Sequence, residues 1–140
     1  RYNETTYNTL QCYSHLRSQG YRIVATTPQK RDTELRELDL YTGKMALVFG
    51  TEYEGLTESA IENADEYVRI PMYGFTESFN ISVTAALSLY DLTGRLRNSR
   101  LDWTVSEEEA LEITLDWCRR SVKKWQLLEN DFLKNYNTGD

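Results

Sequence analysis

The sequence predicts an α/β fold in which helices flank a parallel β-sheet and a helical extension follows. Three short apolar segments, residues 21–25, 45–49 and 66–70, have the composition of strands, and helical or polar segments separate them. Strands that alternate with helices favour a parallel sheet. Glycine turns and polar residues directly follow these strands, at the edge where open α/β sheets bind ligands. We therefore expect a ligand site at the carboxyl ends of the strands.

The first half of the chain supplies two helices and a long polar connection. Residues 4–19 have a helical pattern that stops at Gly20, and the side chains along one side are Tyr7, Leu10, Ser14 and Leu16. Residues 29–44 are polar and charged, so we expect a loop that carries a short helix. Thr57 is a good cap for a short helix over residues 57–63.

The second half is predicted to be mostly helical. A long helix is expected over residues 80–97, and residues 106–109 form a capping box. Apolar residues then recur at three- and four-residue steps: Leu111, Leu115, Cys118, Val122, Trp125 and Phe132. This spacing predicts an amphipathic helix over residues 106–136. We expect two parts, a domain at residues 1–100 and a helical extension at residues 101–140.

Composition restricts the classes of function. A chain of 140 residues with a net charge of −6 is an ordinary globular domain and not an indiscriminate nucleic-acid binder, although a local basic patch remains possible. No apolar run reaches the roughly 18 residues that a membrane span needs. His15 is the single histidine, which nearly excludes histidine-based metal sites and Ser-His-Asp catalysis, and we expect no metal. Cys12 and Cys118 lack metal or redox spacing, which favours reduced thiols and a cytoplasmic location.

Three segments in series carry a family resemblance. They are residues 49–56 (FGTEYEGL), 70–74 (IPMYG) and 78–83 (SFNISV). In order and spacing they resemble the second and third motifs of the SpoU/TrmH ribose methyltransferases of the SPOUT superfamily. The resemblance implies a SPOUT-type sheet with a deep trefoil knot in its C-terminal half, and a homodimer. It also implies transfer of a methyl group from S-adenosylmethionine to a ribose 2′-hydroxyl of RNA.

The resemblance assigns roles to particular residues. Those implied to bind the methyl donor are Thr26, Gly50, Gly55, Ile70, Met72 and Phe79, while Glu52, Ser78 and Asn80 are implied to organise the catalytic site. At Gly50 we expect that a Cβ would occupy ligand space. Without the resemblance, the same glycines are turn residues, Ile70 and Phe79 are core, Glu52 is a solvated or capping carboxylate, and Ser78 or Asn80 caps a helix.

A basic cluster on the tail is the candidate RNA contact. Its members are Arg119, Arg120, Lys123 and Lys124, which could bind phosphates or form an ordinary solvated helix face. Trp117 and Trp125 are expected to pack in a core or dimer interface. Residues 117–124 look more like the tRNA branch of the family than the ribosomal RNA branch. This favours a guanosine ribose in the tRNA D-loop, with ribosomal RNA as the alternative substrate.

The family's first motif, with its asparagine and arginine, has no match here, and we expect the chain to be the C-terminal portion of a longer protein. The family assigns activation of the 2′-hydroxyl to that arginine, and Arg22, Arg69 and Arg95 are not expected to replace it. We therefore expect the chain alone to be nearly inactive in methyl transfer. A non-catalytic RNA-binding or dimerisation module of the same fold is the alternative function.

Overall fold

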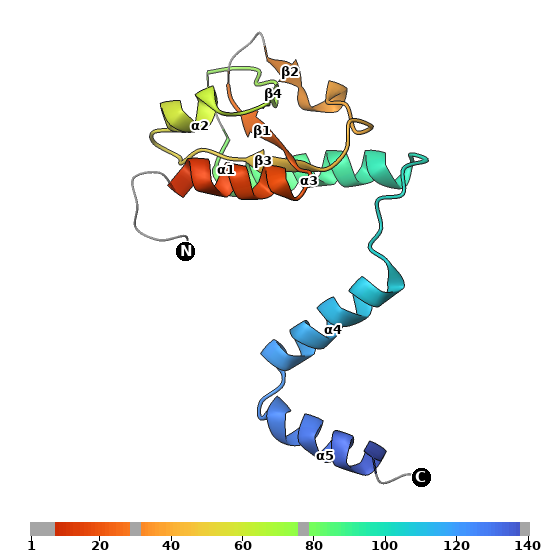
Figure 1. Ribbon diagram of the computed structural model, residues 1–140. Helices are drawn as coiled ribbons and strands as arrows, with labels where there is room; N and C mark the ends of the chain where they lie inside the picture. Colours follow the sequence, from red (N-terminus) through yellow and green to blue (C-terminus); the bar gives the residue numbers. More distant parts are fainter. Residues whose placement is uncertain (1–7, 29–31, 76–78, 138–140) are drawn as a thin grey trace. The chain divides into compact units, whose positions relative to one another are not determined.

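The computed structural model describes residues 8–28, 32–75 and 79–137. These residues form two compact units that divide between Leu101 and Asp102. Figure 1 labels their helices and strands. None of the helices in the described ranges is both long and apolar enough to cross a membrane.

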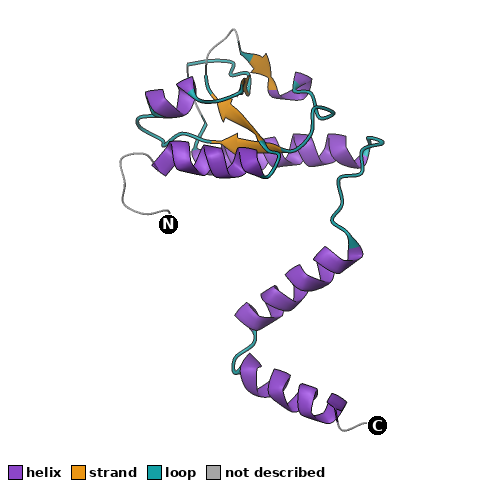
Figure 2. Cartoon of the chain, viewed as in Figure 1, coloured by secondary structure: helices purple, strands orange, loops and turns teal. Residues whose placement is uncertain are grey.

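The first unit contains a four-stranded sheet in which every neighbouring pair is parallel, as the sequence predicts (Figure 2). Its strands are β1 (Arg22–Thr26), β2 (Thr33–Glu34), β3 (Met45–Val48) and β4 (Glu66–Arg69), in the order β2-β4-β1-β3. Strand β2 lies in the segment that the sequence predicts as a loop. The sequence does not reveal this strand, because two residues are too few to show the alternating pattern of a strand. The short helix expected in that segment is a 3₁₀ helix, η1 (Leu35–Glu37).

Three α-helices complete the unit: α1 (Asn8–Ser18), α2 (Glu58–Glu62) and α3 (Ile81–Arg97). The predicted cap of α2 is confirmed, since the Thr57 side chain accepts a hydrogen bond from the Ala60 N–H at 3.2 Å. Asn80 caps α3 in the same way, with its side-chain oxygen 2.8 Å from the Ser82 nitrogen. A polar cap satisfies one backbone N–H that the first helical turn leaves unpaired.

Successive side chains of β1 point to opposite faces of the sheet and begin two separate cores. Ile23 packs with Tyr13 of α1 and Ala60 of α2, whereas Val24 packs with Leu92 of α3 and with Leu35 of η1. The sheet therefore has α1 and α2 on one face and α3 and η1 on the other. The predicted stripe of α1 is partly wrong: its Leu16 borders the first cluster, but the side chain that α1 buries is Tyr13.

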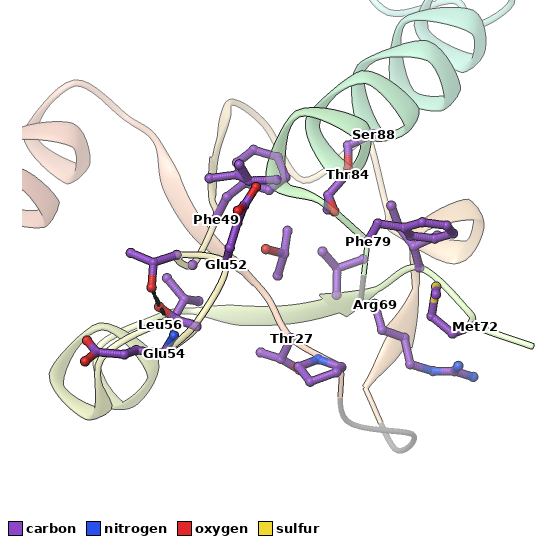
Figure 3. Close-up of a pocket in the computed structure, with 18 of the residues that line it drawn as sticks. Thr27, Phe49, Glu52, Glu54, Leu56, Arg69, Met72, Phe79, Thr84 and Ser88 are labelled. Carbon is purple, nitrogen blue, oxygen red and sulfur yellow. Dashed lines mark hydrogen bonds between the residues drawn. The ribbon is translucent and has the colours of Figure 1, made fainter. Parts of the chain in front are cut away.

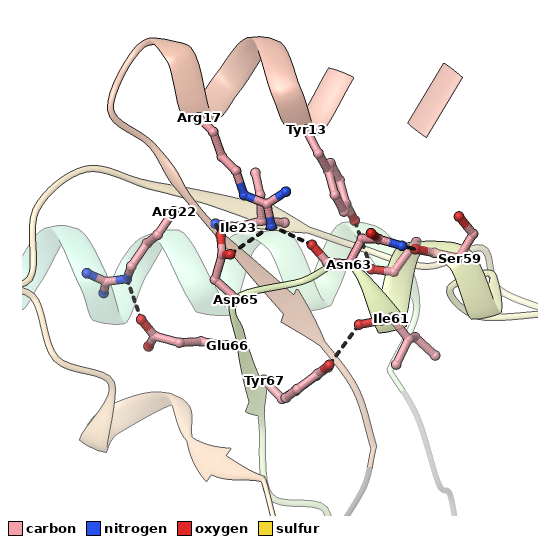
Figure 4. Close-up of polar contacts among 11 residues, drawn as sticks. Tyr13, Arg17, Arg22, Ile23, Ser59, Ile61, Asn63, Asp65, Glu66 and Tyr67 are labelled. Atoms are coloured by element: carbon pink, nitrogen blue, oxygen red, sulfur yellow. Dashed lines mark hydrogen bonds and ion pairs between the residues drawn. The ribbon is translucent and has the colours of Figure 1, made fainter. Parts of the chain in front are cut away.

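Asp65, just before β4, joins α1 to the sheet (Figure 4). Its carboxylate accepts hydrogen bonds from the Arg17 guanidinium at 2.7 Å and from the Ile23 backbone N–H at 2.6 Å. Arg17 also donates to the Asn63 carbonyl at 2.6 Å. Burial raises the pKa of Asp65, but these two hydrogen bonds and the positive charge of Arg17 outweigh it, so the pKa lies below its ordinary value.

We predict that Asp65→Ala lowers the free energy of unfolding by about 1–3 kcal/mol at pH 7, because the N–H of the fully buried Ile23 loses its partner. A carboxyl whose pKa is lowered by folding stabilises the fold above its unfolded pKa, and this contribution is lost as the pH falls through the folded pKa. In urea titrations, the difference in free energy of unfolding between the variant and the wild type should therefore become smaller below about pH 4. If this difference in free energy of unfolding does not change with pH, then the negative charge of Asp65 does not contribute the stability.

The second unit contains two helices, α4 (Glu107–Ser121) and α5 (Trp125–Asn137), so the single helix predicted over residues 106–136 is wrong. Ser106 caps α4 as predicted, accepting from the Glu109 N–H at 3.1 Å. The chain then turns extended at Val122 and takes a positive φ of 59° at Lys124. The apolar spacing continues from Val122 to Trp125 across this turn, which is why the pattern alone does not show the break.

Candidate functional site

A pocket of about 350 Å³ lies at the carboxyl ends of β1, β3 and β4 (Figure 3). Residues at and just after the ends of these three strands form most of its lining. The rest comes from the N-terminal half of α3 and from Phe79, Leu35 of η1 and Ile61 of α2. In Figure 3, Glu52 and Leu56 lie on one side, and Met72 and Phe79 lie on the other. The sheet edge predicted to bind a ligand therefore does contain a cavity.

One wall is a tight loop after β3. The Thr51 N–H donates to the Gly55 carbonyl at 2.9 Å, and the Gly55 N–H donates back to the Thr51 carbonyl at 3.1 Å. The Glu54 N–H adds a bond to the Thr51 hydroxyl at 3.2 Å. Gly55 has a φ of +69°, a left-handed conformation that residues with a Cβ rarely adopt. These contacts fix the loop that carries Glu52.

Gly50 is required for a different reason from the one expected. A Cβ built on Gly50 would lie 2.3 Å from the Gly55 carbonyl carbon and 2.5 Å from the Leu56 nitrogen. The atoms in its way are backbone atoms of the loop, not ligand space. The expectation that a side chain here would occupy ligand space is therefore wrong in its reason, although Gly50 does line the pocket.

All six residues predicted to bind the methyl donor line this one pocket. Besides the two glycines, they are Thr26 at the end of β1, Ile70 and Met72 after β4, and Phe79 just before α3. The Thr26 hydroxyl is already engaged, because it donates to the Val48 carbonyl at 2.9 Å and ties the end of β1 to the end of β3. The fold thus brings together segments that are more than fifty residues apart.

The catalytic candidates are partly connected. The Asn80 side-chain N–H donates to a carboxylate oxygen of Glu52, so the cap of α3 also holds the loop after β3. Glu52 lines the pocket beside this contact. Ser78 lies outside the described residues.

Asn80 has two roles that substitution can separate. We predict that Asn80→Ala lowers the free energy of unfolding by about 1 kcal/mol, because α3 loses its cap. Asn80→Ser keeps a good capping side chain but loses the amide N–H that binds Glu52, so it should retain nearly all of the stability. Chemical denaturation of both variants measures this difference. Equal losses would show that the bond to Glu52, and not the cap, contributes the stability.

Sequence reasoning missed two hydroxyl residues of α3. Thr84 and Ser88 line the pocket four residues apart on one face of the helix. The sequence does carry a signal for them. Thr84, Ser88, Leu92 and Leu96 follow one another at four-residue steps on one face of the helix, and the two hydroxyl residues stand where a wholly apolar stripe would have apolar ones.

Three arginines of the first unit, Arg22, Arg69 and Arg95, are engaged inside the fold. Arg69 lines the pocket, yet its guanidinium donates to Glu34 at 2.7 Å and joins β4 to β2. Arg22 pairs with Glu66 at 2.8 Å. Arg95 donates to the Leu35 carbonyl at 2.9 Å.

The four basic tail residues do not form one uniform strip. Arg119 pairs with Glu129 and lies over the Trp125 ring, 5.3 Å from its centroid, while Arg120 pairs with Asp116 at 2.8 Å. Lys123 and Lys124 lie in the turn between α4 and α5 and are exposed. Arg119 thus contributes to the α4–α5 contact, whereas Arg120 and the two lysines are exposed.

Comparison with known proteins gives one family. The SpoU rRNA Methylase family matches residues 3–90, a stretch that includes the loop after β3 and the first half of α3.

Curated relatives and a solved structure agree with this match. A protein of Borreliella burgdorferi named tRNA (guanosine(18)-2′-O)-methyltransferase is 45% identical over 115 residues, covering 82% of this chain and 52% of the relative. One of the same name from Aquifex aeolicus is 35% identical over 120 residues, covering 84% and 56%. The crystal structure of the A. aeolicus TrmH/SpoU tRNA modifying enzyme superposes with a TM-score of 0.68 and 34% identity, covering 83% of this chain and 59% of that one. The chain spans about half the length of these curated relatives.

Proposed function

Because the chain belongs to the SpoU rRNA Methylase family, we propose that it binds S-adenosylmethionine and serves methyl transfer to a ribose 2′-hydroxyl of RNA. The observation that carries this proposal is the pocket at the strand ends, which all six predicted donor-binding residues line together with Glu52. These residues are far apart in the sequence and differ in chemistry. Their meeting in one pocket is therefore what a shared binding site would produce.

The pocket fits such a donor. Its volume of about 350 Å³ is in the range of small-molecule sites. Gly50, Ile70 and Phe79 would hold the donor between the loop after β3 and the start of α3. The donor, when bound, supplies an electrophilic methyl group on a sulfonium. Glu52 and Asn80 hold each other at the edge of the pocket, where they would position the reacting groups.

We propose tRNA as the substrate, with a guanosine ribose as the methylated group. The support is that two relatives with 45% and 35% identity share the name tRNA (guanosine(18)-2′-O)-methyltransferase. Ribosomal RNA, which the family's description names, is the second candidate substrate. The tail unit, with Lys123 and Lys124 exposed, is proposed to contact RNA phosphates.

Three further properties belong to this proposal: a homodimer, the family's trefoil knot and a cytoplasmic location. Exposed apolar side chains on α3 support the dimer, with Val83 43% and Leu87 39% exposed. Strand β4 supports the knot, because it is the last of the described strands along the chain and yet lies between β1 and β2. Light scattering at several protein concentrations tests the dimer.

The direct test of the proposal is calorimetric titration of the 140-residue chain with S-adenosylmethionine and S-adenosylhomocysteine. We expect one site per chain for each. Methyl transfer is then measured in the protein as its gene encodes it, with labelled donor and either tRNA or ribosomal RNA, and the modified ribose is mapped by its resistance to alkali. RNA binding without donor binding would instead favour a non-catalytic RNA-binding module.

A further inference from the structure

Ser88 is a buried polar residue of α3 whose hydroxyl is unpaired within the part of the chain that the structure describes. Its side chain is 1% exposed, and its hydroxyl oxygen has no hydrogen-bond partner among the described residues. Buried hydroxyls are nearly always paired, because an unpaired one loses its bonds to water without compensation. Ser88 also lines the pocket at the strand ends. An unpaired hydroxyl at that place is one that a ligand can satisfy.

The position of Ser88 on α3 marks a change from core to pocket. Leu92 packs in the core with Val24 and Val68, and Leu96 borders the same cluster. Ser88 lies four residues before Leu92 on the same face of the helix, and Thr84 lies four residues before Ser88. Both Ser88 and Thr84 line the pocket (Figure 3). Leucine at these positions would continue the core, so the hydroxyls appear where the helix leaves it.

The two hydroxyls differ in what they are free to do. Thr84 donates to the carbonyl of Asn80 at 3.1 Å, as a threonine in a helix commonly does. Ser88 makes no such bond within the described residues. Ser88 therefore keeps both its donor and its acceptor capacity for another molecule.

The surroundings of Ser88 select the part of the ligand that would reach it. The most buried lining residues are Ser88, Val68 at 1% exposure and Leu35 at 6%. Lining residues near the opening, such as Glu52 and Tyr53, are exposed. A charged group would lose its hydration at the apolar inner end without a partner of opposite charge. A purine has apolar faces and a polar edge, and it needs only one or two hydrogen bonds there.

We propose that the Ser88 hydroxyl hydrogen-bonds to the polar edge of the adenine of the bound methyl donor, so that the base lies at the inner end of the pocket and the charged amino-acid part lies toward its opening. This inference rests on the proposed function, because it assigns one contact of the same ligand. Ser88 acts here as a determinant of purine specificity.

The test compares the wild-type chain with Ser88→Ala in calorimetric titrations with S-adenosylhomocysteine. The probes also include its analogues without the exocyclic amino group or with carbon in place of N1, N3 or N7. Losing one neutral hydrogen bond should weaken binding of S-adenosylhomocysteine about three- to tenfold in Ser88→Ala. The analogue that lacks the partner atom should lose a similar factor in the wild type and nothing further in the variant.

Two controls separate this contact from a structural effect. Thr93→Ala removes a hydroxyl from the same helix, but that hydroxyl is exposed and donates to the Leu89 carbonyl at 2.6 Å, so ligand binding should not change. Without ligand, Ser88→Ala should melt at the same temperature as the wild type or higher, because an unpaired buried group is removed. Ser88→Cys keeps the shape of the side chain but replaces the hydroxyl with a weakly hydrogen-bonding thiol. It should lose affinity as Ser88→Ala does, and it serves if the alanine variant does not fold.

Wild-type affinity in Ser88→Ala, or equal losses with every analogue in both proteins, would overturn the assignment of Ser88 and leave donor binding intact. A wild-type chain that binds neither S-adenosylmethionine nor S-adenosylhomocysteine would overturn the proposed function first, and this inference with it.

Discussion

Gly50→Ala should weaken binding of S-adenosylmethionine by well over tenfold, where each tenfold corresponds to about 1.4 kcal/mol. The added methyl group would meet the Gly55 carbonyl carbon at 2.3 Å and the Leu56 nitrogen at 2.5 Å. These are backbone atoms of a loop closed by two hydrogen bonds, so no side chain can rotate away to make room. The loop must move, and it carries Glu52 and Leu56 of the pocket wall with it.

Calorimetric titration of the variant measures this loss, and Gly94→Ala is the matched control. Gly94 lies in α3, and a Cβ there meets nothing within 4 Å. Gly94→Ala should bind the donor like the wild type and should stabilise the helix by up to about 1 kcal/mol. If Gly50→Ala binds the donor as tightly as Gly94→Ala, then the loop does not form part of the donor site.

Gly50 illustrates which parts of the candidate site can be predicted from the sequence and which cannot. The motif residues 49–56 and their position after a strand predict that Gly50 lies at the sheet edge where a ligand site is expected, and the structure places Gly50 in the lining of the pocket at that edge. What Gly50 avoids is the backbone of residues 55–56, and that close approach exists only after the loop has closed. Spacing within a motif shows that a small residue is needed, but not which atoms require it.

Other features depend on local signals of different strength. The capping side chains Thr57, Asn80 and Ser106 act over three residues at most, so the sequence shows them directly. Strand β2 has two residues and offers no period. To predict the role of Ser88, one must know which face of α3 is turned toward the sheet and where the pocket lies. Both are properties of the tertiary structure.

Changing Arg119, Arg120, Lys123 and Lys124 together to glutamine should weaken tRNA binding and reduce its dependence on salt. Each lost phosphate contact reduces the slope of log affinity against log salt by about 0.7 for single strands and by about 0.9 for B-DNA, so by somewhat less than one. The structure predicts an unequal division of this effect. Lys123 and Lys124 are exposed in the turn after α4, so Lys123→Gln with Lys124→Gln should reduce the slope by nearly two.

The two arginines should contribute less to the slope, because each already has a carboxylate partner. Arg119→Gln removes the ion pair with Glu129 and the contact with the Trp125 ring, so it should loosen the α4–α5 pair and lower its unfolding temperature. Titrations of fluorescent tRNA over a range of KCl concentrations measure the slopes. A charge-matched control, Arg36→Gln with Lys44→Gln, alters the first unit by the same two charges and should leave the slope nearly unchanged. If that control reduces the slope as much as the lysine pair does, then net charge and not the turn between α4 and α5 governs RNA binding.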